Sequence, residues 1–280
     1  MAWWNRSPVR LCCSALIILE APALHSTSHQ PSHLHVLAKR FSALAPLSHA
    51  ENDLLRGLAE ATRYHPPYRD VHAAGAPPMR PRMIVAGWAA QYRQLVDGQR
   101  QIISLKLPGD LIRPLFLIHL PLPCAVAALT ELETVDAQPL AEAAAGSAHS
   151  SLGQAIHVMA HMDRMLLGDQ IVRLGRQTAC GRFAHLMLEL HERLDRVGLA
   201  EADRFAMPLT QETLADVLGF SVVHVNRTVQ QLRRERLLDV RNGQVVLLQP
   251  ERLRELAGWA PLPGLPVVPK TSRRSYSPEK

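Results

Sequence analysis

The chain has 280 residues, enough for a sizeable buried core and for two domains. Its 31 lysines and arginines exceed its 25 aspartates and glutamates, and this net charge of +6 is compatible with a polyanionic partner but common among soluble proteins. The four cysteines (Cys12, Cys13, Cys124 and Cys180) lack the spacing of a zinc site, and the fourteen histidines are scattered, so we expect no metal. A Ser/His/Asp constellation and a Gly-rich phosphate loop are both missing, which argues against an enzyme.

The N-terminal segment imitates a secretory signal peptide, with Arg6 and Arg10 placed around the start of the apolar run 11–19. That run is too short to span a bilayer as a helix, and the DNA-binding pattern near the other end of the chain argues against secretion. We therefore expect a cytoplasmic protein in which residues 1–37 form a poorly ordered extension, for which an upstream start codon is one explanation. Residues 259–280, rich in Pro, Ser and basic side chains, are expected to form a mobile tail.

Residues 38–145 are predicted to form a sensor domain built on an antiparallel, jelly-roll-like β-roll. A helical lead-in is expected over residues 40–63, with Ser48 as the N-cap of a helix that starts near Ala50. Short apolar runs separated by turn residues follow, and Asp97-Gly98 between two of them is a hairpin signal. The candidate strands are Tyr68–His72, Met83–Ala86, Ala90–Leu95, Gln101–Leu107, Ala125–Leu129 and Glu133–Asp136.

Residues 139–175 are predicted to be helical, and residues 146–177 to serve as a dimerisation helix. Apolar residues with near-heptad spacing form a single seam, which is typical of a long exposed helix that pairs with a second copy of itself. The alternative is that this seam packs on the chain's own β-roll. The seam residues are Leu152, Ile156, Met159, Leu166 and Leu174.

A helix predicted over Thr178–Val197 leads into the most informative segment of the chain, Pro208–Leu237. Thr210 is placed to cap a helix over Gln211–Leu218, and Gly219 supplies a residue for a tight turn. Ser221 can cap a second helix that runs to about Arg236. In that helix Val225, Val229 and Leu232 form one buried stripe, and Val223, Arg227, Gln230 and Arg234 lie on the opposite face.

This pattern predicts a helix-turn-helix, whose second helix docks in the major groove of DNA. Two helices joined by a glycine turn also occur as ordinary αα-hairpins, but the next segment favours the DNA-binding interpretation. Asn242-Gly243 between two apolar runs predicts a β-hairpin with a type I′ turn, so residues 178–258 read as a winged helix-turn-helix. Basic residues also cluster here, against only Glu235 and Asp239: they are Arg227, Arg233, Arg234, Arg236 and Arg241.

A β-roll, a long dimer helix and a C-terminal winged helix, in that order, resemble the Crp/Fnr family of bacterial transcription regulators over roughly residues 40–257. The resemblance implies an α+β protein with a cyclic-nucleotide-binding-like β-roll. It further implies a homodimer that binds a two-fold symmetric operator in double-stranded DNA and recruits or obstructs RNA polymerase. The motifs that carry it are Gly87-Trp88-Ala89, the segment 97–102, Leu107-Pro108-Gly109-Asp110, the segment 182–186, Leu209-Thr210-Gln211 and the segment 223–228.

By the same resemblance, Arg227 matches the arginine that reads guanine. Val223 stands where many members carry a glutamate that accepts a hydrogen bond from cytosine; a valine can instead contact a thymine methyl, so the half-site should differ from the best-known consensus. Asn226 and Gln230 are expected at base edges, and the remaining residues at DNA are Thr210, Gln211, Ser221, His224, Arg234 and Arg241.

The sensor half departs from the family pattern. Where cyclic-nucleotide-binding members carry a Gly-Glu pair and an Arg-Ser pair, this chain has the segment 119–126, HLPLPCAV, and no arginine occurs between Arg113 and Arg164. Binding of cyclic AMP or GMP is therefore not expected. Adjacent Cys12 and Cys13 cannot replace the N-terminal cluster of iron–sulfur members, so no cofactor is assigned. The β-roll is then either a sensor for an unknown effector or a structural platform for dimerisation. A second hypothesis is a small-molecule-binding module that signals through protein contacts and carries a vestigial helix-turn-helix.

Overall fold

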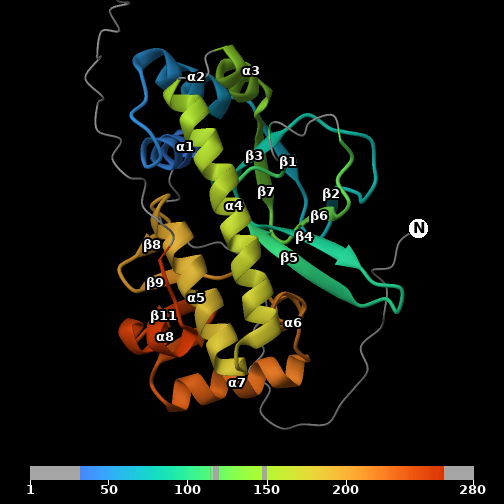
Figure 1. The fold of residues 1–280 in the computed structure, drawn as a ribbon, viewed down its shortest axis with the longest axis vertical. Coiled ribbons are helices and arrows are strands. Elements are labelled where there is room, and N and C mark those ends of the chain that lie inside the picture. Colours follow the sequence, from blue (N-terminus) through green and yellow to red (C-terminus); the bar gives the residue numbers. More distant parts are fainter. Residues whose placement is uncertain (1–31, 114, 116–119, 147–149, 262–280) are drawn as a thin grey trace, which may run out of the picture.

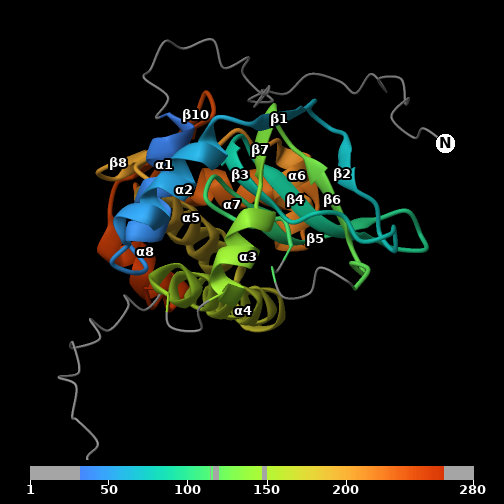
Figure 2. The ribbon, with the colours of Figure 1, turned by 90° about the horizontal axis from the view of Figure 1, so that it is seen from above.

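The computed structural model describes residues 32–113, 115, 120–146 and 150–261. The molecule is elongated, with a β-roll on one side, a winged helix at one end and a long helix, α4 (Ser151–Arg176), that runs between them along the front (Figure 1). Seen from above, α4 lies at the periphery, on the side away from the strands (Figure 2). Among the described residues, no helix has both the length and the apolar content needed to cross a membrane.

Two N-terminal helices, α1 (His33–Ser42) and α2 (His49–Ala59), cover the upper end of the molecule. Ser48 is the N-cap of α2 as predicted, and it forms a capping box with Glu51. α1 begins inside the segment that the sequence predicted to be a poorly ordered extension, because its apolar face, including Val36 and Leu37, is buried. Of that extension, residues 1–31 lie outside the described part of the chain, as do residues 262–280 of the predicted tail.

The β-roll consists of two antiparallel sheets, which confirms the predicted fold class. One sheet has the strand order β1-β7-β3 and the other β2-β6-β4-β5. The strand bounds are β1 Thr62–His65, β2 Asp70–His72, β3 Arg82–Ala86, β4 Ala89–Gln94, β5 Arg100–Lys106, β6 Ala125–Ala128 and β7 Leu132–Asp136. The sequence missed β1, because three of its four side chains are exposed and its partner β7 lies about seventy residues away, with Thr62 opposite Val135.

Glycine turns set the geometry of the roll at two places. Gly98, with φ of 85°, closes the hairpin of β4 and β5 as its sequence predicted. Gly109, with φ of 90°, turns the chain after β5, and a Cβ there would lie 3.1 Å from the Val197 side chain. The turn brings Asp110, whose carboxylate accepts from the Leu107 amide, into contact with Arg40 and Arg193.

The predicted helix over residues 139–175 divides into α3 (Gln138–Gly146) and α4, and the latter begins after the N-cap Ser150. α5 (Ala179–Asp195) follows after the N-cap Thr178. Leu152, Ile156, Met159 and Leu166 of α4 are buried in a core that they share with α1, α2 and strands β3 and β7. The structure thus corrects the expected dimer seam, since these side chains pack on their own chain and Leu174 is half-buried near Gly219.

The winged helix comprises α6 (Gln211–Leu218), α7 (Val222–Arg234), α8 (Pro250–Ala257) and one sheet of order β10-β11-β9-β8. The predicted hairpin is β10 (Leu238–Arg241) with β11 (Gln244–Leu247), here called the wing. The sequence did not identify the two short strands β8 (Ala200–Glu201) and β9 (Arg204–Ala206), which extend the wing sheet. Its core is continuous with Trp88, Ile102 and Leu105 of the β-roll, so the two halves pack as one hydrophobic unit.

Candidate DNA-binding interface

The first helix of the helix-turn-helix, α6, has the ends that its sequence predicts. The Thr210 hydroxyl accepts from the Thr213 amide at 3.1 Å and so caps the helix. Gly219 ends it in the left-handed region, with φ of 65°. A Cβ at Gly219 would lie 3.2 Å from the Leu174 side chain of α4, so this turn is tight as well as left-handed. The small side chain of Ala215 is buried where α6 packs against α7.

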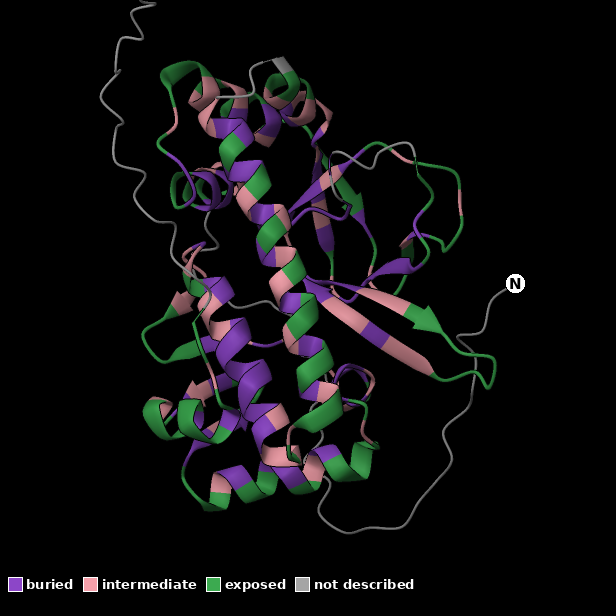
Figure 3. Cartoon of the chain, viewed as in Figure 1, coloured by how far each residue is buried: buried purple, intermediate pink, exposed green. Residues whose placement is uncertain are grey.

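The second helix, α7, buries the predicted stripe and exposes the predicted face. Ser221 caps it by accepting from the His224 amide, and Val225, Val229 and Leu232 are buried against the rest of the domain. Together with Thr228, these residues fix the orientation of the helix. The exposed residues Val222, Val223, Arg227, Gln230 and Arg234 form what we call the recognition face. Figure 3 shows α7 at the lower end of the molecule, with its buried side toward α5 and its exposed side outward.

The recognition face combines two arginines that have no acidic partner among the described residues, Arg227 and Arg234, with an apolar patch. The Arg227 guanidinium is exposed and forms no ion pair or hydrogen bond with any described residue. Val222 and Val223 are 36% and 60% exposed at the first turn of the helix. Exposed valines at a helix N-terminus have no packing role in the monomer, so they are available for contact with a partner.

The other predicted contact residues lie around this face, but several are held by neighbours. The Asn226 amide donates to Gln211 Oε1 at 2.7 Å, so α6 orients this half-buried side chain. The His224 ring stacks on Phe220, with centroids 4.5 Å apart, and the Arg182 guanidinium lies 4.6 Å from the centroid of the same phenyl ring. Thr210 and Ser221 use their hydroxyls as caps at two helix N-termini, which is where phosphates bind favourably.

The wing adds charge that is partly neutralised. Asn242 and Gly243 have φ of 51° and 70°, which fits the predicted type I′ turn. Arg241 precedes the turn and lies 2.9 Å from Asp239, and Arg233 lies 2.8 Å from the same residue. Of the predicted basic cluster, Arg227, Arg234 and Arg236 therefore form no ion pair with any described residue, and the first two of these stand on the recognition face.

Side chains from three elements hold the C-terminal end of α6, where the last carbonyls of a helix lack intrahelical partners. Gln101 of β5 donates to the Asp216 carbonyl at 2.8 Å. Gln170 of α4 donates to the Val217 carbonyl at 2.8 Å, and Arg182 of α5 donates to the Leu218 carbonyl at 2.9 Å. We call these three residues the α6 clamp, and Arg100 strengthens it through an ion pair of 2.6 Å with Asp216. The clamp connects α6, the first helix of the helix-turn-helix, directly to the β-roll, to α4 and to α5.

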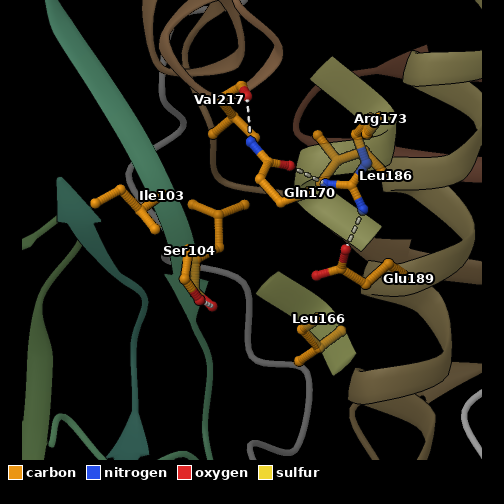
Figure 4. Close-up of a pocket in the computed structure, with 9 residues that line it drawn as sticks. Ile103, Ser104, Leu166, Gln170, Arg173, Leu186, Glu189 and Val217 are labelled. Carbon is orange, nitrogen blue, oxygen red and sulfur yellow. Dashed lines mark hydrogen bonds and ion pairs between the residues drawn. The ribbon is translucent and has the colours of Figure 1, made fainter. Parts of the chain in front are cut away.

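A buried ion network continues from the clamp toward the β-roll and α1. It comprises Arg173 of α4, Glu189 and Arg193 of α5, Asp110 of the turn after β5, and Arg40 of α1. Figure 4 shows the end of the network nearest the clamp, where Arg173 bonds to both Gln170 and Glu189 and Gln170 reaches Val217 around a small cavity. Arg193 joins Glu189 at 2.7 Å and Asp110 at 2.5 Å.

Charge compensation decides the ionisation of this network. Burial alone would raise the pKa of Glu189, but the attraction of Arg173 and Arg193 outweighs it and lowers the pKa below its ordinary value. The pKa of Asp110 is also lowered, because Arg193, Arg40 and Lys106 outweigh its burial. Burial, assisted by Arg173, lowers the pKa of His185 to about 4, so that this ring is neutral and accepts from Arg173 at 3.0 Å.

Comparison with known proteins identifies the family. Residues 181–256 match the model of the Crp-like helix-turn-helix domain. The nitrogen fixation regulation protein FixK of Bradyrhizobium diazoefficiens is 30% identical over 178 residues, which cover 62% of this chain and 72% of the relative. The transcriptional activator protein FnrL of Cereibacter sphaeroides is 30% identical over 191 residues, which cover 66% of this chain and 75% of the relative. The chain belongs to the Crp/Fnr family. It is a DNA-binding transcription regulator and not an enzyme.

The structure of FixK2 from Bradyrhizobium japonicum agrees with this assignment. It is 26% identical, has a TM-score of 0.62, and the match covers 72% of this chain and 98% of the FixK2 chain. The resemblance proposed from sequence motifs is thereby confirmed, including the β-roll and the C-terminal helix-turn-helix of a Crp/Fnr regulator. The α6 clamp and the ion network are contacts that the sequence pattern did not indicate, although Gln101, Asp110 and Arg182 lie in the motif segments 97–102, 107–110 and 182–186.

In the sensor half of this Crp/Fnr regulator, segment 119–126 differs in sequence from the cyclic-nucleotide-binding members. Arg113, the last arginine before that segment, is buried and bonds to backbone carbonyls. Arg113 is 1% exposed and donates to the carbonyls of Met79 and Leu120, at 3.2 and 2.6 Å. Cys124 is buried and accepts from the Gln91 amide, and Cys180 is half-buried at the start of α5. Cys12 and Cys13 lie outside the described residues.

Proposed function

We propose that this Crp/Fnr regulator acts as a homodimer on a two-fold symmetric operator, with α7 of each copy in the major groove. The observation that carries the proposal is the recognition face, where an unpaired arginine and two exposed valines project from a helix whose opposite side is fixed by the domain core. Val222 and Val223 lie exposed beside Arg227 on this helix, where a bound partner would cover them.

The proposed dimer face is a stripe along α4 that differs from the seam expected from the sequence. Its exposed positions recur at alternating spacings of three and four residues, so they lie along one face of the helix, as the positions of a helix–helix seam do. Leu167, Ile171 and Val172 in the lower half of α4 are 41%, 72% and 54% exposed. We name the stripe the α4 outer stripe; its members are Gln154, His157, His161, Arg164, Gly168, Ile171 and Gly175.

The half-site follows from the chemistry of the recognition face. The Arg227 fork can donate to the two acceptors of a guanine in the major groove. Val223 cannot accept a hydrogen bond from cytosine and fits a thymine methyl instead. Gln230, Asn226 and Arg234 supply further polar contacts, while the N-termini of α6 and α7 bind phosphates.

The remaining partners are also proposals. A regulator of this kind works in the cytoplasm, where its DNA lies, and it acts on transcription by recruiting or obstructing RNA polymerase. The absence of an arginine at the phosphate-binding stretch supports an effector other than cyclic AMP or GMP, and Cys12-Cys13 does not match an iron–sulfur cluster motif.

The experiment is a selection of bound sites from random double-stranded DNA, with and without cell metabolites, for the parent and for Val223→Glu. The parent should return two half-sites about one helical turn apart. Val223→Glu should change the preferred base at one position of each half-site and leave the spacing unchanged. A single unpaired half-site, or the same preference from both proteins, would contradict the proposed geometry.

A further inference from the structure

Two histidines on the α4 outer stripe have the spacing of a helical metal chelate. His157 and His161 are four residues apart and both are exposed. Side chains at i and i+4 lie on the same face of a helix, with Cβ atoms about 5–6 Å apart. Two imidazoles at this spacing can bind one metal ion, as they do in helical zinc sites.

The ring of His157 is already oriented by the helix. Its Nδ1 lies 2.8 Å from the Gly153 carbonyl oxygen, and because a carbonyl can only accept, Nδ1 is the donor. In the tautomer that donates from Nδ1, the lone pair of the ring is on Nε2. A hydrogen bond from the other ring nitrogen to a backbone carbonyl is the arrangement that metal-binding histidines usually have.

One copy of the chain does not complete such a site. Among the described residues, no group of three or more His, Cys, Asp or Glu is placed to hold a metal ion. In a dimer that pairs through the α4 outer stripe, the number of histidines near one another is doubled. In two parallel helices related by a two-fold axis, residues with the same number face one another across the seam. His157 and His161 occupy adjacent layers of the stripe, about 6 Å apart along the helix, so two copies bring four imidazoles together.

We propose that α4 of two copies together form a binding site for a divalent transition metal ion of the Zn²⁺ class, held by His157 and His161 of each copy. This inference rests on the dimer proposed above. Imidazole nitrogen suits such ions, and four ligands match the tetrahedral preference of zinc. Arg164, the next member of the stripe, places a positive charge one turn away that disfavours any divalent cation, so the imidazole bonds must outweigh this repulsion. The ion connects the two helices at the polar end of the seam.

The test uses the full chain without an affinity tag, freed of metal by a chelator. Zn²⁺ is titrated by calorimetry into the parent, the double variant His157→Gln/His161→Gln, and the control His49→Gln. His49 is a suitable control because its side chain is 89% exposed on α2, far along the chain from the stripe. The dimer dissociation constant is measured by sedimentation with and without Zn²⁺.

The parent and the control should bind one ion per two chains, and Zn²⁺ should tighten their dimers. The double variant should bind Zn²⁺ at least about tenfold more weakly, since loss of even an outer partner costs about 10–100-fold, and its dimer should not respond. Equal binding by the double variant, or one ion per chain without an effect on the dimer, would overturn the metal site. A metal-free dimer that takes up no Zn²⁺ overturns this inference alone, whereas a protein that is monomeric with and without Zn²⁺ overturns the proposed dimer as well.

Discussion

Glu189 is the residue on which the buried ion network depends most, and its replacement by glutamine gives a quantitative test. Glu189 is 5% exposed and bonds to both Arg173 and Arg193. In Glu189→Gln, Arg193 keeps its ion pair with Asp110. Arg173, which is 2% exposed, loses the only carboxylate with which it forms an ion pair in the described part of the chain, and keeps only neutral partners, Gln170 and His185.

The expected loss follows from that uncompensated charge. Breaking a buried pair by removing one partner costs about 3–5 kcal/mol. The glutamine oxygen still accepts one hydrogen bond, so we expect the lower end, about 3 kcal/mol of unfolding free energy. For a protein of this size this corresponds to a decrease in Tm of about 6–12 °C.

Thermal and urea unfolding, followed by circular dichroism, measure this loss. The control is Glu251→Gln, which removes an exposed ion pair with Arg254 and should cost below about 1 kcal/mol. The double variant Arg173→Met/Glu189→Gln removes the stranded charge and should recover part of the loss. Equal losses for Glu189→Gln and the control, or a double variant less stable than the single one, would refute the reasoning.

Three further predictions concern pH, a turn and the dimer face. The pKa values of Asp110 and Glu189 are lowered in the folded chain, so their contribution to stability is present above the unfolded pKa values of about 4. This contribution is lost as the pH falls through the folded pKa values. The difference in Tm between the parent and Glu189→Gln should therefore shrink in acid. Gly219→Ala should cost about 1–2 kcal/mol in urea unfolding, because φ is 65° and the added Cβ would crowd Leu174, whereas Gly57→Ala in open space within α2 should be neutral or stabilising. Ile171→Asp should shift the sedimentation equilibrium toward monomer without a change in the circular dichroism of the fold, and an unchanged dimer would contradict the α4 outer stripe.

The parts of the fold that were predictable are those that local chemistry determines. Thr210 and Ser221 cap helices because a hydroxyl before an amphipathic run satisfies free amides. Gly219 and Asn242-Gly243 adopt positive φ where the sequence places residues that tolerate it. The recognition face was equally predictable, because it is the complement of a buried stripe with helical spacing.

The parts that sequence reasoning missed depend on contacts between distant segments. Strand β1 forms because it pairs with β7, and its own side chains are largely exposed. α4 has apolar residues on two faces, so spacing alone did not distinguish the face toward the chain's own core from the face left open. The α6 clamp consists of Gln101, Gln170 and Arg182, which bond to backbone carbonyls, and such bonds leave no pattern in the sequence.

The clamp and the network connect the winged helix to the β-roll, to α4 and to α1. The carbonyls at the end of α6 are held by β5, α4 and α5 together, and Arg193 joins α5 to the turn after β5. Any shift of α4 relative to the β-roll would therefore change the hydrogen bonds that hold the C-terminal end of α6.

The most direct test of the central claim is the DNA affinity of Arg227→Ala at the operator obtained by selection, measured at two salt concentrations. The matched control is Arg252→Ala, which removes an exposed arginine of α8 outside the recognition face. Arg227→Ala should lose about 1–3 kcal/mol of specific binding, roughly a 5- to 150-fold rise in Kd, while binding to random DNA changes little. The control should bind like the parent. If Arg227→Ala binds the operator as tightly as the parent does, α7 does not read the DNA as described.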